Sequence, residues 1–220
     1  MEKPAKIRYV PALRFNWLTP FYDAVVATMT RERTFKEALI KQSDIKAGQR
    51  VLDLGCGSGT LVIWIKQAQP LADVTGVDGD PAILARAKGK ARSIKVSVHF
   101  DQALSQNLPY PAAHFDSAVS SLFFHHLNRT SKQCAARELF RVLKPGAQLH
   151  VADWGAPGNF LMRGLFVFIQ LLDGFGNTQD NVSGKLVELF EQAGFSEVAE
   201  RRSFSTVFGT MVLYSAVKPR

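Results

Sequence analysis

Residues 51–60 read VLDLGCGSGT, an apolar run that passes directly into a turn with three alternating glycines. A short apolar run that is bounded by glycines and followed by an apolar periodic segment predicts a buried strand over 50–54 and a helix over 59–68. Glycine tolerates positive φ and leaves no side chain in the way of a ligand. We therefore expect this turn to aim free backbone N–H groups at a ligand above the sheet.

The spacing of the glycines and the acid before them distinguish between ligand classes. The turn reads G-x-G-x-G, whereas the dinucleotide fingerprint that seats a pyrophosphate reads G-x-G-x-x-G. Asp53 stands two residues before Gly55, where a carboxylate would repel a phosphate but could orient the loop or meet a cationic group. The pattern favours a ligand with an amino-acid head and a positive centre. The alternative is a tight turn that binds nothing.

A second acid follows at a matching place. Asp78 closes a predicted strand over 74–77, and an acid at the end of this strand can accept hydrogen bonds from both hydroxyls of a ribose. Gly79 comes next and would let an adenine ring lie close to the backbone. The alternative is that Asp78 makes a turn or caps the helix that starts at Pro81.

Strands and helices alternate along the chain, which predicts βαβ units and a mostly parallel sheet whose ligands bind at the carboxyl ends of the strands. No helix separates the final two strands, so they should pair as an antiparallel hairpin. The predicted helices cover 12–47, 59–68, 82–89, 132–143, 160–172 and 182–193, and the predicted strands cover 50–54, 74–77, 94–100, 115–120, 148–152, 195–204 and 207–217.

The composition is that of one globular domain. The 220 residues are 46% hydrophobic and 21% charged, enough to bury a full core. The two cysteines form no spaced pair, so neither a disulfide framework nor a metal site is predicted. No signal peptide is visible and the apolar segment 160–172 is too short to span a bilayer, so we expect a cytoplasmic protein. The net charge of +8 fits a solvated basic face, a nucleic acid or an acidic membrane surface.

Four motifs follow one another at 51–60, 74–84, 115–127 and 138–149. Together they resemble those of class I S-adenosylmethionine-dependent methyltransferases, most closely the branch of ubiquinone and menaquinone biosynthesis (methyltransferase type 11). The resemblance implies an α/β, Rossmann-like sheet of seven mostly parallel strands, with an antiparallel C-terminal hairpin and helices on both faces. It also implies S-adenosylmethionine as cofactor and S-adenosylhomocysteine as product. The resemblance further implies an N-terminal helical cap over 1–49, the methyltransferase domain over 50–220 and, within that domain, a substrate lid over 155–182.

The resemblance also implies a set of cofactor-binding residues, with one departure from the family pattern. Relatives often carry Gly-Asp-Ala where this chain has Ala103-Leu104-Ser105, so the Asp that accepts the adenine amino group is missing. The backbone of Ala103 and Leu104 would then meet the adenine, or Asp101 would compensate. Asp53, Gly55 and Gly57 would hold the methionine part, and Ser120 would lie beside the sulfonium. The full set of cofactor-binding residues implied is Tyr22, Asp53, Gly55, Cys56, Gly57, Asp78, Gly79, Ala103, Leu104 and Ser120.

Two histidines, His125 and His126, follow the strand over 115–120. A histidine there could remove a proton from an oxygen or carbon nucleophile, because its pKa lies near neutrality. The alternative is that one histidine packs and the other is solvated. Methyl transfer from a sulfonium is an in-line displacement that positioning and desolvation can accelerate without a strong base.

The apolar residues of 160–169 favour a small lipophilic or aromatic acceptor that is methylated at oxygen or carbon, with a peripheral membrane contact left open. The same segment could instead be a core helix or a homodimer face. Two other functions stay open: an RNA methyltransferase, from the positive charge, and a non-catalytic cofactor-binding partner protein, from the missing adenine-binding Asp. Nucleic acid is less favoured, because residues 120–123 read SSLF and not Asn/Asp-Pro-Pro-aromatic.

Overall fold

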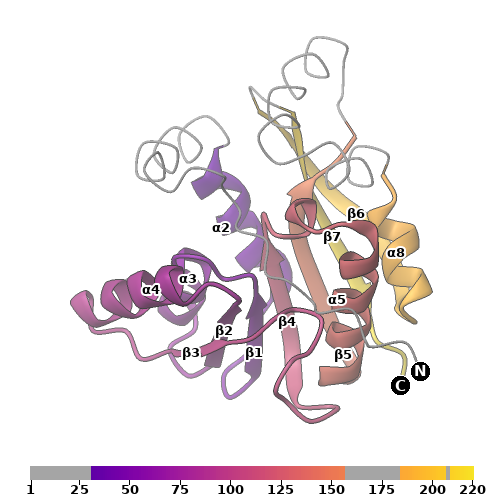
Figure 1. Ribbon diagram of the computed structural model, residues 1–220. Helices are drawn as coiled ribbons and strands as arrows, with labels where there is room; N and C mark the ends of the chain where they lie inside the picture. The colour runs from indigo at the N-terminus through magenta and orange to yellow at the C-terminus, as the bar shows by residue number, and fades with distance from the viewer. Residues whose placement is uncertain (1–30, 157–183, 207–208) are drawn as a thin grey trace.

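The computed structural model describes residues 31–156, 184–206 and 209–220, and these residues build a seven-stranded sheet in the order β3-β2-β1-β4-β5-β7-β6 (Figure 1). β1, β2, β3, β4 and β5 are parallel, and β7 pairs antiparallel with both β5 and β6. The predicted α/β fold, with a parallel sheet and an antiparallel C-terminal hairpin, is confirmed. The strands are β1 Arg50–Leu54, β2 Asp73–Asp78, β3 His99–Gln102, β4 Phe115–Ser121, β5 Leu143–Trp154, β6 Ser196–Ser205 and β7 Thr210–Val217.

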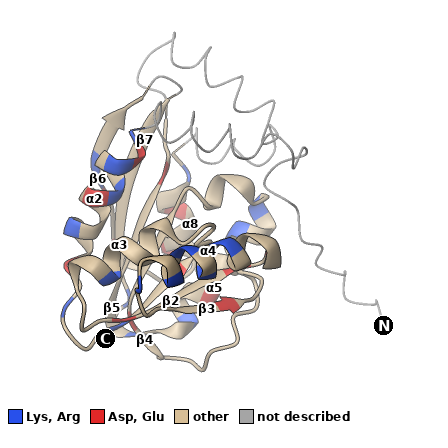
Figure 2. Cartoon of the chain, turned by 90° about the vertical axis from the view of Figure 1, so that its left-hand side faces the viewer, with Lys and Arg blue, Asp and Glu red and all other residues tan. Residues whose placement is uncertain are grey.

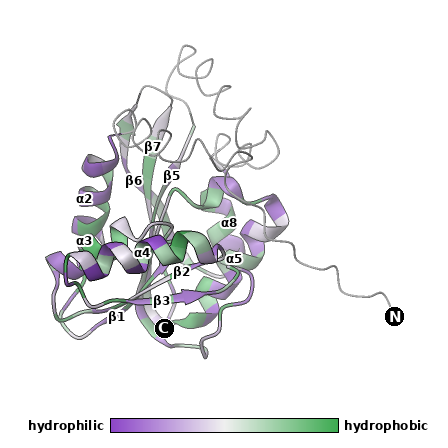
Figure 3. Cartoon of the chain, turned by 60° about the vertical axis from the view of Figure 1, so that its left-hand side comes forward, coloured by the Kyte–Doolittle hydropathy of each residue, from purple (hydrophilic) through white to green (hydrophobic). Residues whose placement is uncertain are grey.

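Helices cover both faces of the sheet and each face has its own apolar core. One core joins α2, α3 and α4 to the sheet, and the other joins α5 and α8 to the opposite face. Helices α4 and α5 each carry hydrophilic and hydrophobic residues, as amphipathic helices do (Figure 3). The helices are α2 Glu32–Ser43, α3 Thr60–Ala68, α4 Pro81–Ser93, α5 Arg129–Val142 and α8 Leu186–Gln192, with a short 3₁₀ helix, η1, at Phe124–His126.

Local capping explains where two helices begin. Asp80 accepts hydrogen bonds from the backbone N–H groups of Ala82 and Ile83, and Pro81 takes the first position of α4. Asn128 caps α5 in the same way, which starts that helix three residues before the predicted 132. Side-chain acceptors satisfy N–H groups that have no partner inside a helix.

The predicted strand over 94–100 is wrong for residues 94–98. Helix α4 continues to Ser93, Ile94 closes it, and Lys95 has a φ of 55°. β3 begins only at His99, where it pairs with Thr75 of β2. The alternating pattern in this segment therefore belongs to a helix end and a turn.

The end of β7 is fixed to the place where α5 passes into β5. β5 starts directly after α5, and its register with β4 is irregular between Phe115 and Ser117. The ammonium of Lys218 donates to the carbonyls of Phe140 and Leu143, two carbonyls at the end of α5. Among the described residues, no helix has the length and apolar character needed to cross a membrane.

Candidate functional site

The glycine loop between β1 and α3 has the backbone geometry that its sequence predicts. Gly55, Gly57 and Gly59 have φ of 73°, 52° and 74°, values that residues with a Cβ rarely adopt. A Cβ on Gly55 would lie 2.2 Å from the ring of Phe123, whereas the nearest side-chain atom to a Cβ on Gly57 would be Ile83 Cδ1 at 4.0 Å. Gly55 thus serves packing, and Gly57 is the glycine that leaves the loop open.

The sequence predicted that this loop presents free N–H groups to a ligand. That prediction is wrong for four residues of the loop, whose N–H groups donate within the protein. The N–H groups of Gly55 and Cys56 both donate to the Val77 carbonyl, at 2.8 and 3.0 Å. Gly57 N–H donates to Asp78 and Gly59 N–H to the Cys56 carbonyl. These four N–H groups are therefore engaged within the protein, and the glycines keep their other property, which is to let a ligand approach the backbone closely.

Cys56 contributes backbone to the loop, because its side chain turns away. The cysteine is 8% exposed, and its Sγ fills the space beside Gly76 of β2. Burial, with Asp53 and Asp78 nearby, raises the pKa of the thiol. Cys56 is therefore a packing side chain within the loop that the sequence assigned to the cofactor.

Asp53 lies directly beneath this loop with an unsatisfied carboxylate. It is 1% exposed, and neither of its oxygens has a hydrogen-bond partner within the structure. Burial raises the pKa of Asp53 to about 7, with Lys36 acting in the opposite direction and Asp78 adding to the rise. A buried carboxylate is costly unless it is paired, so the end of β1 is a ready site for a cationic group.

Two further polar residues lie on the same face of the sheet, and the sequence analysis missed both. Lys36 of α2 is 9% exposed, pairs with Glu32, and interacts electrostatically with Asp53. Ser121 lies two residues beyond Val119, which pairs with Asp53 across β1 and β4, and its hydroxyl is buried without a partner within the structure. The only sequence signal for Lys36 was an i,i+4 acid–base spacing, which is typical of an ordinary helix surface.

Asp78 at the end of β2 holds the glycine loop in place. Its two oxygens accept the N–H groups of Gly57 at 2.9 Å and Asp80 at 3.0 Å. Burial raises the pKa of Asp78 above its ordinary value, against these backbone hydrogen bonds. A carboxylate offers about four acceptor positions, so the bonds within the protein leave room for a ribose. Gly79 lies beside it, and its carbonyl accepts from Gln102.

The segment that departs from the family pattern sits next to Asp78. Ala103 donates its N–H to the Asp78 carbonyl at 3.1 Å, so Ala103 and the adjoining Leu104 follow β3 beside the predicted adenine edge. Asp101 accepts a hydrogen bond from the Tyr110 hydroxyl at 2.7 Å. Asp101, which was predicted to compensate for the missing Asp, therefore already accepts a hydrogen bond within the protein.

Ser120 connects β4 to the start of the glycine loop. It is 0% exposed, and its hydroxyl donates to the Leu54 carbonyl at 2.7 Å. Leu54 immediately precedes Gly55, so Ser120 fixes the position at which β1 ends. The structure gives Ser120 this anchoring contact at the predicted place in the sheet.

Asp153 at the end of β5 organises the turn that carries the two histidines. Its carboxylate accepts the N–H groups of Phe124 at 2.7 Å and Trp154 at 2.7 Å, and pairs with His125 Nδ1 at 2.8 Å. Although burial raises the pKa of Asp153, His125 and the backbone donors outweigh it and hold the pKa below its ordinary value. Asp153 was not predicted, and its signal was an acid directly after the strand over 148–152.

The two histidines differ in their contacts. His125 is 4% exposed and held by Asp153, whereas His126 is partly exposed and contacts the His125 ring at a tilt of 44°, with ring centroids 3.9 Å apart. Burial and the neighbouring His125 lower the pKa of His126 well below its ordinary value, so its ring is neutral at pH 7. A neutral imidazole is the form that accepts a proton.

Within the described residues, most of the predicted site lies on one side of the molecule, where β1, β2, β4 and β5 have their carboxyl ends. Tyr22, residues 1–30 of the predicted cap and residues 157–182 of the predicted lid lie outside the described residues. Basic residues recur along α4 and are exposed (Figure 2), and one of them, Lys90, donates to the Thr60 hydroxyl at the end of the glycine loop.

The comparisons with known proteins agree with this geometry. Residues 51–146 match the family model of a methyltransferase domain. A demethylmenaquinone methyltransferase of Deinococcus radiodurans is 29% identical over 154 residues, which cover 69% of this chain and 63% of that protein, less than two thirds of its length. An uncharacterised methyltransferase of Synechocystis sp. is 32% identical over 169 residues, 76% of each chain. The solved structure of the S-adenosylmethionine-dependent methyltransferase SibL shares the fold, with a TM-score of 0.74 and 20% identity over 91% of this chain and 58% of that one.

Proposed function

Since this chain belongs to the class I S-adenosylmethionine-dependent methyltransferases, we propose that it transfers the methyl group of S-adenosylmethionine to a small apolar or aromatic acceptor, at oxygen or carbon. The observation that carries the cofactor is the carboxylate of Asp53, 1% exposed and without a hydrogen-bond partner within the structure, beneath a loop that is open at Gly57. The ammonium of an amino-acid head would satisfy it. The G-x-G-x-G spacing and the acid before the loop speak against a diphosphate.

The residues present fit the cofactor at two further points. Asp78 keeps acceptor positions for ribose hydroxyls after its two backbone hydrogen bonds. Lys36 and Ser121 add a cation and a hydroxyl near Asp53, and these groups suit the carboxylate of the same amino-acid head. The bound cofactor supplies an activated methyl group on a sulfonium.

The chain's own residues position the acceptor and handle its proton. Asp153 fixes the backbone of η1 and the orientation of His125, so the two rings are held in one arrangement. We propose that His126 accepts the proton of a hydroxyl acceptor and that His125 positions it. Holding the reactants in line and out of water supplies the rest of the acceleration.

The acceptor class follows from the relatives and from the sequence. The Deinococcus relative is named a demethylmenaquinone methyltransferase, and residues 160–169 of this chain are rich in aromatic and aliphatic side chains. We propose that this segment, within the lid over 155–182, covers a lipophilic acceptor, and that Tyr22 from the cap covers the cofactor. Contact with a membrane surface and formation of a homodimer stay predictions.

The first experiment is a calorimetric titration with S-adenosylhomocysteine and, in parallel, with NAD. We expect micromolar binding of the first and none of the second. Acceptor panels of quinols, phenols and lipids, with labelled S-adenosylmethionine, then test transfer. Tight binding of NAD, or no binding of S-adenosylhomocysteine, would overturn the proposed function.

Two alternatives are tested by the same panel. An RNA methyltransferase predicts RNA binding that weakens steeply with salt, and a basic α4 is the surface that would contribute. A non-catalytic partner protein predicts binding of S-adenosylhomocysteine without turnover on any acceptor. Transfer to a small acceptor with no RNA binding would exclude both.

A further inference from the structure

The hydroxyl of Tyr214 is buried without a hydrogen-bond partner within the structure. Tyr214 is 1% exposed, yet its oxygen neither donates to nor accepts from another group. Buried tyrosine hydroxyls usually find a partner, and each exception calls for an explanation. Tyr214 is on β7, far along the chain from every motif of the sequence analysis.

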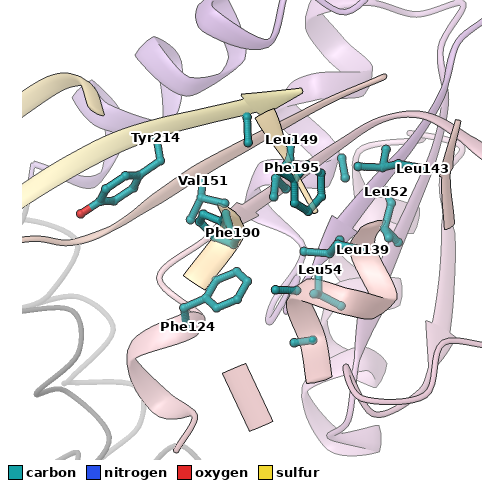
Figure 4. Packing of buried hydrophobic residues seen from close by; sticks show 14 of the residues in the cluster. Leu52, Leu54, Phe124, Leu139, Leu143, Leu149, Val151, Phe190, Phe195 and Tyr214 are labelled. Carbon is teal, nitrogen blue, oxygen red and sulfur yellow. The ribbon is translucent and has the colours of Figure 1, made fainter. Parts of the chain in front are cut away.

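The hydroxyl points toward the carboxyl ends of the parallel strands, where the candidate site lies. Tyr214 pairs with Val151 across β5 and β7, and its ring lies on the face of the α5 and α8 core (Figure 4). In Figure 4 the hydroxyl oxygen points away from the other labelled side chains, such as Phe190. A Cβ on Gly155 would lie 3.2 Å from this oxygen and 2.4 Å from Val212, so the hydroxyl reaches the carboxyl end of β5.

Two acids act electrostatically on this hydroxyl: Glu200, which pairs with Tyr214 across β6 and β7, and Asp153 near the end of β5. Asp153 pairs with Val212, two residues before Tyr214, and same-face diagonal neighbours in such a ladder are about 7–8 Å apart. Asp153 is already committed to η1 and His125. The hydroxyl is therefore close to the Asp153–His125 pair but is not bonded to it.

We propose that the Tyr214 hydroxyl binds the oxygen atom of the methyl acceptor, which makes Tyr214 a specificity-determining residue for aromatic acceptors with a hydroxyl or carbonyl group. The inference rests on the proposed function and names the acceptor chemistry of the same site. A hydrogen bond in apolar surroundings is strong, and a group left unpaired there is costly. Acceptors that supply the missing partner are selected over hydrocarbons of the same shape.

The test uses two ligands that differ in one hydroxyl, 1-naphthol and 1-methylnaphthalene, titrated into the full chain with and without S-adenosylhomocysteine. We expect the wild type to bind 1-naphthol about three- to tenfold more tightly, the range for one net hydrogen bond. Tyr214→Phe should bind both ligands equally. Its melting temperature should stay the same or rise, because the substitution removes an unpaired buried hydroxyl.

Tyr110→Phe is the matched control, because the Tyr110 hydroxyl donates to Asp101 within the protein. This variant should lower the melting temperature and keep the preference for 1-naphthol. The proposal is overturned if Tyr214→Phe keeps that preference, if it lowers the melting temperature as Tyr110→Phe does, or if neither ligand binds the wild type. Failure of S-adenosylhomocysteine to bind would sink the proposed function instead, while the preference measured without it still tests Tyr214.

Discussion

Two aspartates lie buried at the same edge of the sheet, at the ends of β1 and β5, and their surroundings are opposite. Asp53 is 1% exposed and has no hydrogen-bond partner within the structure, and burial raises its pKa to about 7. Asp153 is 0% exposed and is surrounded by backbone donors and His125. Despite burial, those donors hold the pKa of Asp153 below its ordinary value.

The difference separates structural organisation from ligand binding. A buried carboxylate whose partners all come from the protein stabilises the turn that supplies them. A buried carboxylate without partners lowers the stability of the free protein and gains most from a cationic ligand. Side chains of one type and equal burial can thus have opposite effects on stability.

Replacing Asp153 should have the largest effect. Asp153→Ala leaves the N–H groups of η1 and the imidazole of His125 without an acceptor, so we expect a loss of about 3–5 kcal/mol in the free energy of unfolding. Urea denaturation measures it. Asp53→Ala, at equal burial, is the control and should not destabilise; similar losses in the two variants would remove the distinction between these aspartates.

Two glycines of the loop should differ in the same way, one serving packing and the other ligand binding, with smaller changes in the free energy of unfolding. Gly55→Ala places a Cβ 2.2 Å from the Phe123 ring at positive φ, and we expect a loss of about 2–4 kcal/mol from overpacking and backbone strain. Gly57→Ala has the same kind of φ but open space, so about 1–2 kcal/mol is expected, together with weaker binding of S-adenosylhomocysteine. Equal losses of stability would show that Gly57 also serves packing.

Asp53→Asn sharpens the comparison from the ligand side. An amide carries no charge, so the variant should gain about 1–2 kcal/mol of unfolding free energy at pH 8, the scale for an unsatisfied buried group. It should also bind S-adenosylhomocysteine at least about tenfold more weakly, because a charge-assisted hydrogen bond is lost. Calorimetry at pH 8 measures both changes; unchanged affinity would place the amino-acid head elsewhere.

The pH dependence of binding gives the smallest effect. Because the pKa of Asp53 is raised in the folded protein, its contribution to stability is greatest below its ordinary value near 3.8 and is lost as the pH rises to about 7. A bound ammonium favours the ionised form, so affinity for S-adenosylhomocysteine should increase up to about tenfold from pH 6 to pH 7.5. Asp53→Asn should remove that increase; a wild-type affinity independent of pH would contradict the raised pKa.

The features that one continuous stretch encodes could be predicted, and those that depend on distant residues could not. Residues 50–60 contain β1, the glycine loop and Asp53 together, so local patterns were sufficient. The pairing of Asp153 with His125 spans 28 positions, and the approach of Lys36 to Asp53 depends on how α2 packs. Tyr214 had no signal at all, because a tyrosine in an apolar strand is typical of a core.

The strand order β5-β7-β6 also has a consequence for how the chain is made. β7 lies between β5 and β6, so β6 cannot join the sheet until β7, which follows it in the chain, has paired with β5. Until β7 is synthesised, β5 is an open edge that other chains can pair with. β7, which carries Tyr214, therefore joins the sheet late, after the glycine loop and its neighbouring strands are already available to fold.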